Sequence, residues 1–331
     1  MRAVWYERFG PAREVLQTGE MADPVAGPGE VLLRLHASGV NPSDVKLRGG
    51  ARPGAVMAYP RVIPQSDGAG VIEAVGDGVD PACIGQRVWI WNGQWRRAFG
   101  TCAERIALPA AQTAPLPETT APEDAACLGI PAMTAWYALF EHGEIAGQRV
   151  LVTGGAGSVG RYAVQMARLG GAAQVFTTVS GPQKAAHATS HAHPPDAVID
   201  YRQEDVAERV LDLTDGHGVD RIVEVEFGGN LPVTERIIAE RGTVATYASM
   251  GVPAPVLPFY ALMFKNVRLS LTLCYLMPDR LRETGAAAIT QWLAEDRLSH
   301  AVGGVFSLDE AAQAHEAVEA GDCLGTVVVR V

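Results

Sequence analysis

Cysteine is scarce in this sequence, and its spacing shows no pairing pattern. The 331 residues contain five cysteines, an odd number, and none of them forms a Cys-x-x-Cys motif. Neither a disulfide framework nor a cysteine-rich zinc lobe follows from this pattern, which predicts a reduced, cytoplasmic setting.

Long hydrophobic runs and an excess of basic charge are also missing. The longest apolar region, Val252 to Met277, is interrupted by prolines and by Lys265 and Arg268, so we expect no membrane span. The N-terminal residues lack the hydrophobic region of a signal peptide. With 27 basic and 37 acidic residues the formal net charge is −10, which argues against a nucleic-acid partner.

Two kinds of sequence texture follow one another along the chain. Residues 1–120 contain short β-like segments separated by glycine and proline, as in a barrel-like β domain. A helical stretch is expected from Glu123 to about His142, and after it strand-like and helix-like segments alternate. The strands expected in this alternating region are Arg149–Thr153, Gln174–Val179, Ala197–Asp200, Arg221–Val225 and Thr243–Tyr247.

This alternation predicts an α/β fold with a doubly wound parallel sheet of the Rossmann type. Another helix is expected from Leu308 to Ala320, followed by a strand at Thr326–Val331. The predicted organisation is a β-rich domain over residues 1–123, an inserted Rossmann domain over 124–266, and a return segment over 267–331.

The central motif is a glycine-rich loop between an apolar strand and an amphipathic helix. Gly155-x-Gly157-x-x-Gly160 permits a tight turn and close approach of a pyrophosphate, whose charge the helix N-terminus then favours. An ordinary glycine-rich connection is the alternative interpretation. The loop residues assigned to a dinucleotide are Gly155, Ala156, Gly157, Ser158, Val159 and Gly160.

The region after the second strand of this unit predicts the phosphorylated cofactor, NADPH. An NAD-preferring site places an acidic residue about 20 positions beyond the loop. Here no acidic residue occurs between Glu144 and Asp196. Ser180 and Lys184 can donate to a 2′-phosphate, and Tyr201 can close the same pocket. Alternatively, Lys184 is a solvated helix residue.

Several sequence blocks together resemble the zinc-free quinone oxidoreductases of the medium-chain dehydrogenase/reductase superfamily, in particular the zeta-crystallin-like branch. The resemblance covers essentially the whole chain. The blocks that carry it are Gly39–Pro42, Ser66–Gly76, Gly129–Ala135 and the glycine loop.

The resemblance implies a GroES-like catalytic domain, a Rossmann domain, and a homodimer or homotetramer. It implies that Asn41 faces the reacting carbon, where it would polarise or position the substrate; a loop asparagine serving the Asn-Pro turn is the alternative. It also implies a set of residues near the nicotinamide half of the cofactor: Thr134, Tyr247, Ala248, Ser249, Thr272 and Leu273.

Where zinc enzymes of this superfamily have a cysteine and a His-Glu pair, this chain has Asn41 and Ser66-Asp67. Asparagine and serine are poor zinc ligands, so we predict no metal site and no Lewis-acid catalysis. His187, His191 and His193 form a histidine-rich segment that offers a second candidate metal site. We interpret this segment as a solvated helix end.

Three further features have two interpretations each. Lys46 stands where many relatives have tyrosine, and it would either donate to a substrate oxygen or point into solvent. Trp91 and Trp95 would line the substrate pocket with flat surfaces or belong to the core. The segment Val267–Leu273 resembles the family's dimer edge strand; burial within one subunit is the alternative.

The predicted function is NADPH-dependent, zinc-independent hydride transfer to a quinone. An alkenal or enone reductase is the alternative among enzymes, because both reactions need the same hydride geometry. A non-catalytic NADPH-binding or nucleic-acid-associated protein, and a zinc alcohol dehydrogenase, are the remaining alternatives.

Overall fold

The computed structural model describes residues 1–51, 54–321 and 323–331, and it separates into two compact units. The first unit contains Met1–Ile130 and Ala286–Val331, and the second contains Pro131–Gly285. The boundaries expected from the sequence lie at other positions, after residues 123 and 266. The segment that follows residue 266 therefore begins inside the second unit.

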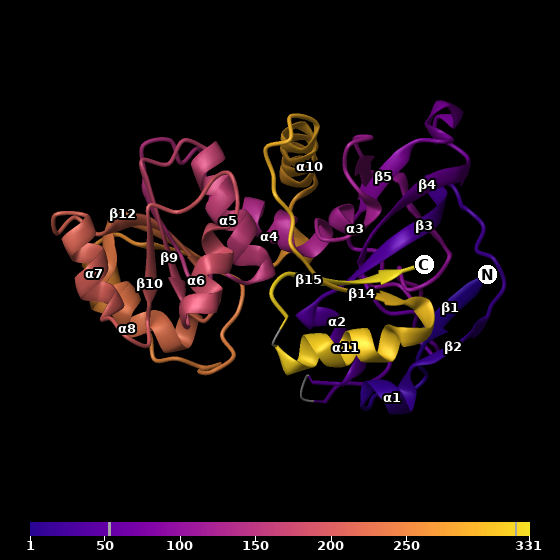
Figure 1. Cartoon of the computed structure of the whole chain (residues 1–331), viewed down its shortest axis with the longest axis horizontal. Coiled ribbons are helices and arrows are strands. Elements are labelled where there is room, and N and C mark those ends of the chain that lie inside the picture. Colours follow the sequence, from indigo (N-terminus) through magenta and orange to yellow (C-terminus); the bar gives the residue numbers. More distant parts are fainter. Residues whose placement is uncertain (52–53, 322) are drawn as a thin grey trace. The chain divides into compact units, whose positions relative to one another are not determined.

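The first unit is built mainly of antiparallel strands (Figure 1). A two-stranded sheet pairs β1 (Arg2–Trp5) with β2 (Gln17–Glu20). In the larger sheet, β15 pairs antiparallel with β3, which brings the end of the chain beside an early strand. The strands of that sheet are β3 (Glu30–Val40), β4 (Asp67–Val75), β5 (Arg87–Ile90), β6 (Arg105–Pro109), β7 (Thr113–Pro115), β14 (Val302–Ser307) and β15 (Thr326–Arg330).

Short helices complete this unit, and its core comes from alternating apolar positions. Leu33, Ile72 and Val88, on three neighbouring strands, are almost completely buried in one cluster, as expected for strands with one face in the core. The helices are α1 (Ala12–Val15), α2 (Pro42–Arg48), α3 (Pro122–Ala125) and α11 (Ala311–Ala320), with short 3₁₀ turns at Pro81–Cys83, Ala110–Gln112 and Leu308–Glu310.

The second unit has a six-stranded parallel sheet in the order β10-β9-β8-β11-β12-β13. This is the Rossmann order, which confirms the predicted fold class. The strands are β8 (Arg149–Val152), β9 (Gln174–Val179), β10 (Ala197–Asp200), β11 (Val219–Glu224), β12 (Ile238–Thr246) and β13 (Arg268–Leu271).

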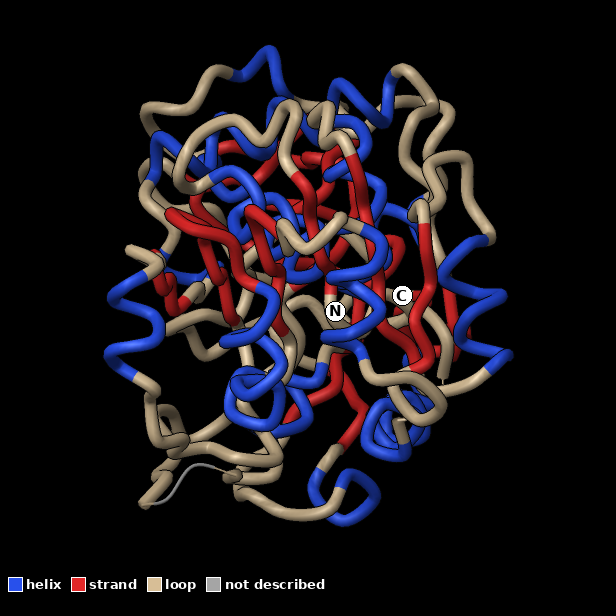
Figure 2. The backbone as a smooth tube through the Cα atoms, turned by 90° about the vertical axis from the view of Figure 1, so that its left-hand side faces the viewer, coloured by secondary structure: helices blue, strands red, loops and turns tan. Residues whose placement is uncertain are grey.

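Helices cover both faces of this sheet: α5 and α6 lie on one side, and α7 and α8 lie on the other (Figures 1 and 2). The helix α5 buries Ala163, Met166 and Ala167, as expected for the apolar face of an amphipathic helix. The helices are α5 (Ser158–Leu169), α6 (Pro182–Thr189), α7 (Val206–Leu213), α8 (Phe227–Ile237) and α9 (Phe259–Phe264), with a 3₁₀ turn at Cys274–Leu276.

Two longer helices, α4 (Gly129–Phe140) and α10 (Asp279–Ala294), run across the boundaries between the units. The single helix expected from Glu123 to His142 is instead divided into α3 and α4. Pro131 explains the break, because proline has no N–H and is tolerated only in the first turn of a helix. The helix therefore restarts just before it.

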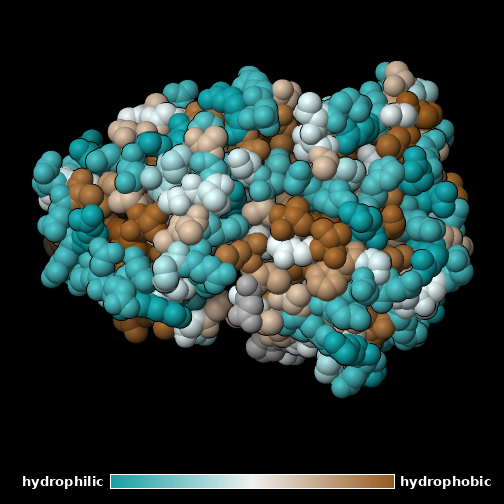
Figure 3. All heavy atoms as spheres, in the orientation of Figure 1, coloured by the Kyte–Doolittle hydropathy of each residue, from teal (hydrophilic) through white to brown (hydrophobic). Residues whose placement is uncertain are grey.

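No helix in the described part of the chain combines the length and apolar character that a membrane crossing requires. On the face drawn in Figure 3, hydrophilic residues predominate and apolar residues gather in smaller patches.

Candidate functional site

The glycine loop lies between the end of β8 and the start of α5. Gly157 is the N-cap of α5 and provides no side-chain cap. The N-terminal end of a helix favours a bound anion. A Cβ atom on Gly160 would collide with the carbonyl oxygen of Gly154. The close packing of α5 against the loop therefore requires glycine at position 160.

Two threonines of β9 hold the glycine loop in place. The backbone N–H of Gly154 donates to Thr178 Oγ1 over 3.1 Å, and that of Gly155 donates to the carbonyl oxygen of Thr178 over 3.1 Å. Thr177 Oγ1 donates to the carbonyl oxygen of Val152 over 2.7 Å. These bonds join the loop to the neighbouring strand before any ligand binds.

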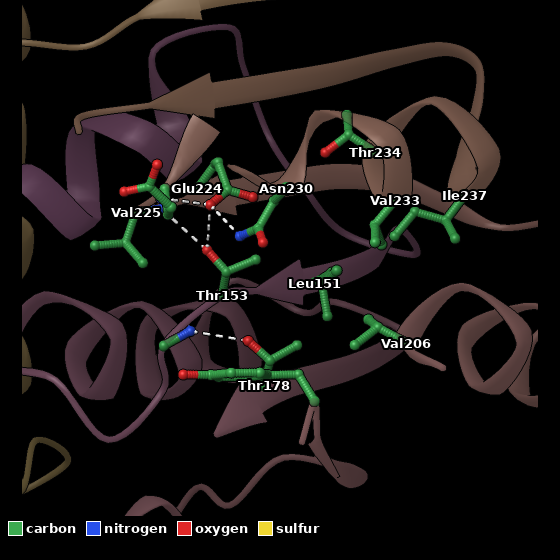
Figure 4. Close-up of a pocket in the computed structure, with 13 residues that line it drawn as sticks. Leu151, Thr153, Thr178, Val206, Glu224, Val225, Asn230, Val233, Thr234 and Ile237 are labelled. Atoms are coloured by element: carbon green, nitrogen blue, oxygen red, sulfur yellow. Dashed lines mark hydrogen bonds between the residues drawn. The ribbon is translucent and has the colours of Figure 1, made fainter. Parts of the chain in front are cut away.

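A cavity of about 270 Å³ opens beside the loop, at the carboxyl ends of β8, β9 and β11 (Figure 4). Ligands of open parallel sheets bind at this edge. Its walls combine aliphatic side chains with several polar groups, which is typical of a small-molecule pocket. The cavity is lined by Leu151, Thr153, Gly154, Thr178, Tyr201, Val206, Glu224, Val225, Glu226, Asn230, Val233, Thr234 and Ile237.

A buried glutamate organises one wall of this cavity. Glu224 Oε1 accepts hydrogen bonds from Thr153 Oγ1 over 2.8 Å, from the backbone N–H of Glu226 over 2.6 Å, and from Asn230 Nδ2 over 2.8 Å. The side chain is completely buried, and burial raises the pKa of its carboxyl group above the ordinary value. Glu224 thus links β8, β11 and α8 at the ligand edge of the sheet.

A second glutamate caps the helix that follows. Glu226 is the N-cap of α8, and its carboxylate accepts from the backbone N–H groups of Met250 and Gly251 over 2.7 and 2.9 Å. Burial is the largest influence and raises its pKa, but the hydrogen bonds from the backbone together outweigh burial and lower the pKa. Glu226 therefore connects α8 with the loop after β12.

The residues predicted to bind the cofactor all lie in the second unit. Ser180 follows β9 directly, Lys184 is exposed on α6, and Tyr201 follows β10 with 53% of its surface exposed. Thr134 and Thr272 are buried, whereas Leu273 is 40% exposed. Apart from the glycine loop, the remaining members are half-buried residues after β12, namely Tyr247, Ala248 and Ser249.

Asn41 is buried at the start of α2, where its contacts are structural. Its Nδ2 donates to Asp67 Oδ2 over 2.7 Å, and its backbone N–H donates to Asp44 Oδ2 over 2.8 Å in a capping box. Burial raises the pKa of Asp44 to about 7. These contacts match the alternative interpretation, an asparagine that serves the Asn-Pro turn. Its contact with substrate stays a prediction.

The other residues predicted in the first unit have distinct surroundings. Lys46 is exposed on α2. Trp91 is 4% exposed, and its ring centroid lies 5.0 Å from that of Trp89, as in a packed core. Trp95 is half-buried, with the guanidinium of Arg96 5.3 Å from its ring centroid. The geometry at Trp91 agrees with the core interpretation.

The residues at the superfamily's zinc positions do not fit a metal. Asn41 directs an amide donor, not a ligand atom, toward Asp67, and Ser66 is a weak zinc ligand. Across the described ranges, no group of three or more His, Cys, Asp or Glu side chains is arranged to hold a metal ion. His187 and His191 are half-buried rather than solvated, and burial and the nearby Arg161 lower their pKa values.

Sequence reasoning missed four functional candidates: Thr153, Thr178, Glu224 and Asn230. Glu224 had one usable signal, an acidic residue at the end of an apolar strand that points to the ligand edge. Thr153, Thr178 and Asn230 had none, because threonine at the end of a strand and asparagine in the first turn of a helix usually serve the backbone.

Comparisons with known proteins agree with this architecture. Residues 27–118 match the family model of the alcohol dehydrogenase GroES-like domain, and residues 158–291 match that of zinc-binding dehydrogenases. The quinone oxidoreductase of Mus musculus is 31% identical over 320 residues, covering 96% of this chain and 93% of the relative.

Two other similarities differ in coverage. A phenolphthiocerol/phthiocerol polyketide synthase subunit of Mycobacterium tuberculosis is 32% identical over 91% of this chain, but this chain spans only 14% of that protein. A mycobacterial protein solved in complex with NADPH superimposes with a TM-score of 0.86 and 30% identity, covering 100% of both chains.

The two units together define an oxidoreductase of the medium-chain dehydrogenase/reductase class. Within that class, this chain belongs to the quinone oxidoreductase family.

Proposed function

We propose that the protein is an NADPH-dependent reductase that transfers hydride to a quinone without zinc. The observation that carries this proposal is the glycine loop with its adjoining cavity. The next strand, β9, has no carboxylate at its end. The bound cofactor supplies the hydride. The chain positions the dinucleotide through the loop backbone and α5.

Preference for the 2′-phosphate rests on Ser180 and Lys184. A carboxylate at the end of β9 would repel the phosphate, whereas a hydroxyl and an ammonium group donate to it. The mycobacterial relative solved with NADPH supports the same cofactor. If Lys184 is instead a solvated helix residue, its replacement leaves the preference for NADPH over NADH unchanged.

We expect Lys184→Ala to narrow the preference for NADPH over NADH by about tenfold, the loss of one exposed charge-assisted contact. Steady-state oxidation of both cofactors, measured as kcat/KM, checks this. Gln183→Ala, one position earlier on the same helix, is the control. A wild type that uses NADH better than NADPH would contradict the assignment of this pocket.

The proposal of zinc independence rests on Asn41 and Ser66, whose side chains are poor zinc ligands. An acceptor reduced without a Lewis acid must delocalise negative charge on its own, as quinones and α,β-unsaturated carbonyls do. The family relatives favour a quinone as the acceptor. Reduction of an α,β-unsaturated carbonyl needs the same hydride geometry. Turnover of a quinone and a conjugated enal side by side separates them; reduction of the enal alone would favour the enone reductase.

We also infer a homodimer formed through β13. This strand is the last in the parallel sheet, and Leu269, Leu271 and Leu273 are 37, 76 and 40% exposed. An apolar edge strand with unpaired backbone groups invites a second strand. A copy of the same strand, related by a two-fold axis, provides one.

Leu271→Glu is expected to shift the protein from dimer to monomer, because the change places like charges together at a two-fold contact. Light scattering after gel filtration reports the mass. Val25→Glu, which alters an exposed apolar residue of the other unit, should leave the mass unchanged. A wild-type monomer at micromolar concentration would rule out this interface.

A further inference from the structure

The cavity beside the glycine loop has one polar side chain whose orientation is determined by its neighbours. Asn230 lies in the first turn of α8, and its Nδ2 donates to Glu224 Oε1 over 2.8 Å. In Figure 4 the amide oxygen of Asn230 is directed toward the space between α8 and β8. Asn230 thus presents a hydrogen-bond acceptor to a ligand.

Neighbouring groups set the orientation of this amide. Oε1 of Glu224 also accepts from the backbone N–H of Glu226 over 2.6 Å and from Thr153 Oγ1 over 2.8 Å. Because the carboxylate oxygen accepts these bonds, the amide nitrogen of Asn230 faces it and the amide oxygen is turned away.

The rest of the cavity suits a flat heteroaromatic ring. Aliphatic side chains of Leu151, Val206 and Val233 form its walls, and the ring of Tyr201 lies on the side of β10. Gly154 of the glycine loop also lines it, so the cavity adjoins the expected position of the pyrophosphate. A purine base at one end of a dinucleotide matches this shape and location.

We propose that Glu224 and Asn230 make this cavity selective for a purine with an exocyclic amine, so that adenine is accepted and hypoxanthine is rejected. The amine of adenine donates to the oxygen of Asn230. Hypoxanthine has a carbonyl oxygen at the same position, which would face a second acceptor and leave both unpaired. The proposal rests on the proposed function, since it assumes that the cavity holds the base of NADPH.

The test compares reduced nicotinamide adenine dinucleotide phosphate with its hypoxanthine analogue, by titrating the wild-type protein and following the fluorescence of the reduced nicotinamide. We expect the analogue to bind at least about tenfold more weakly, the cost of leaving a buried acceptor unpaired. Equal affinity would overturn the proposal. Failure to bind NADPH at all would instead overturn the proposed function beneath it.

A variant assigns the selectivity to the residue named. Asn230→Ala should bind both cofactors within about twofold of each other. Glu235→Gln alters a residue of α8 outside the cavity lining and should keep the wild-type ratio. Selectivity that survives in Asn230→Ala would contradict the proposal. The wild-type ratio itself needs no variant, so it decides the matter even if Asn230→Ala fails to fold.

Discussion

Gly160→Ala is expected to weaken NADPH binding by about a hundredfold and to lower the free energy of unfolding by about 1–3 kcal/mol. The added methyl group would meet the carbonyl oxygen of Gly154, which is backbone and cannot rotate away. The start of α5 must then move away from β8. Fluorescence titration with NADPH and urea unfolding measure the two effects.

Gly157→Ala is the matched control for this change. A Cβ atom there would lie 3.3 Å from its nearest neighbour, the carbonyl oxygen of Gly154, so the folded protein can accept it with a small shift. The residue is exposed where the pyrophosphate is expected. We expect nearly wild-type stability with weakened NADPH binding. If Gly157→Ala binds NADPH normally, the loop does not cradle the phosphates.

Asp67→Ala should lower the free energy of unfolding by about 3 kcal/mol, the second large effect. The carboxyl group is completely buried, and its Oδ2 accepts from Asn41 Nδ2 over 2.7 Å and from the backbone N–H of Ile130 over 2.8 Å. Alanine leaves both donors without a partner inside the protein. Urea unfolding at neutral pH provides the measurement.

Asp67→Asn separates the contribution of the hydrogen bonds to the free energy of unfolding from that of the negative charge. Burial raises the pKa of Asp67 well above its usual range, because it disfavours the charged form of the carboxyl group. An amide keeps an acceptor oxygen for both donors, so we expect a smaller loss than for alanine, within about 1 kcal/mol. A loss as large as that of alanine would mean that the carboxylate charge is required.

The same pKa shift predicts a pH dependence. Because the folded-state pKa is raised, the unfolded chain releases its proton first, and the stability contributed by Asp67 falls as the pH rises from about 4 through the folded-state value. Asp67→Asn should therefore show a smaller decline in stability over that range than the wild type.

Much of the second unit could be predicted from the sequence because its signals are local. A strand, a glycine loop and an amphipathic helix follow one another within residues 149–169, and β9 and β10 begin and end at the expected residues. The doubly wound parallel sheet followed from the alternation, since right-handed crossovers leave few other arrangements.

The details of the cavity could not be predicted in this way. Glu224 and Asn230 are separated by a helix start, and only the folded sheet brings them to Thr153, which follows another strand. Asp67 and Asn41 similarly meet across 26 residues of chain. Such contacts depend on tertiary pairing, which has no periodic signal in the sequence.

Trp91 shows that a clear sequence signal can also have two structural meanings. A cluster of tryptophans suggests a ligand surface, yet Trp89 and Trp91 pack together within the first unit. Aromatic residues serve cores and binding sites equally well, and composition does not distinguish the two.

The most direct test of the account is NADPH oxidation by purified protein with a quinone acceptor, measured with and without a strong metal chelator. We predict steady turnover that the chelator leaves unchanged. Loss of turnover on chelation, restored by zinc, would contradict the account.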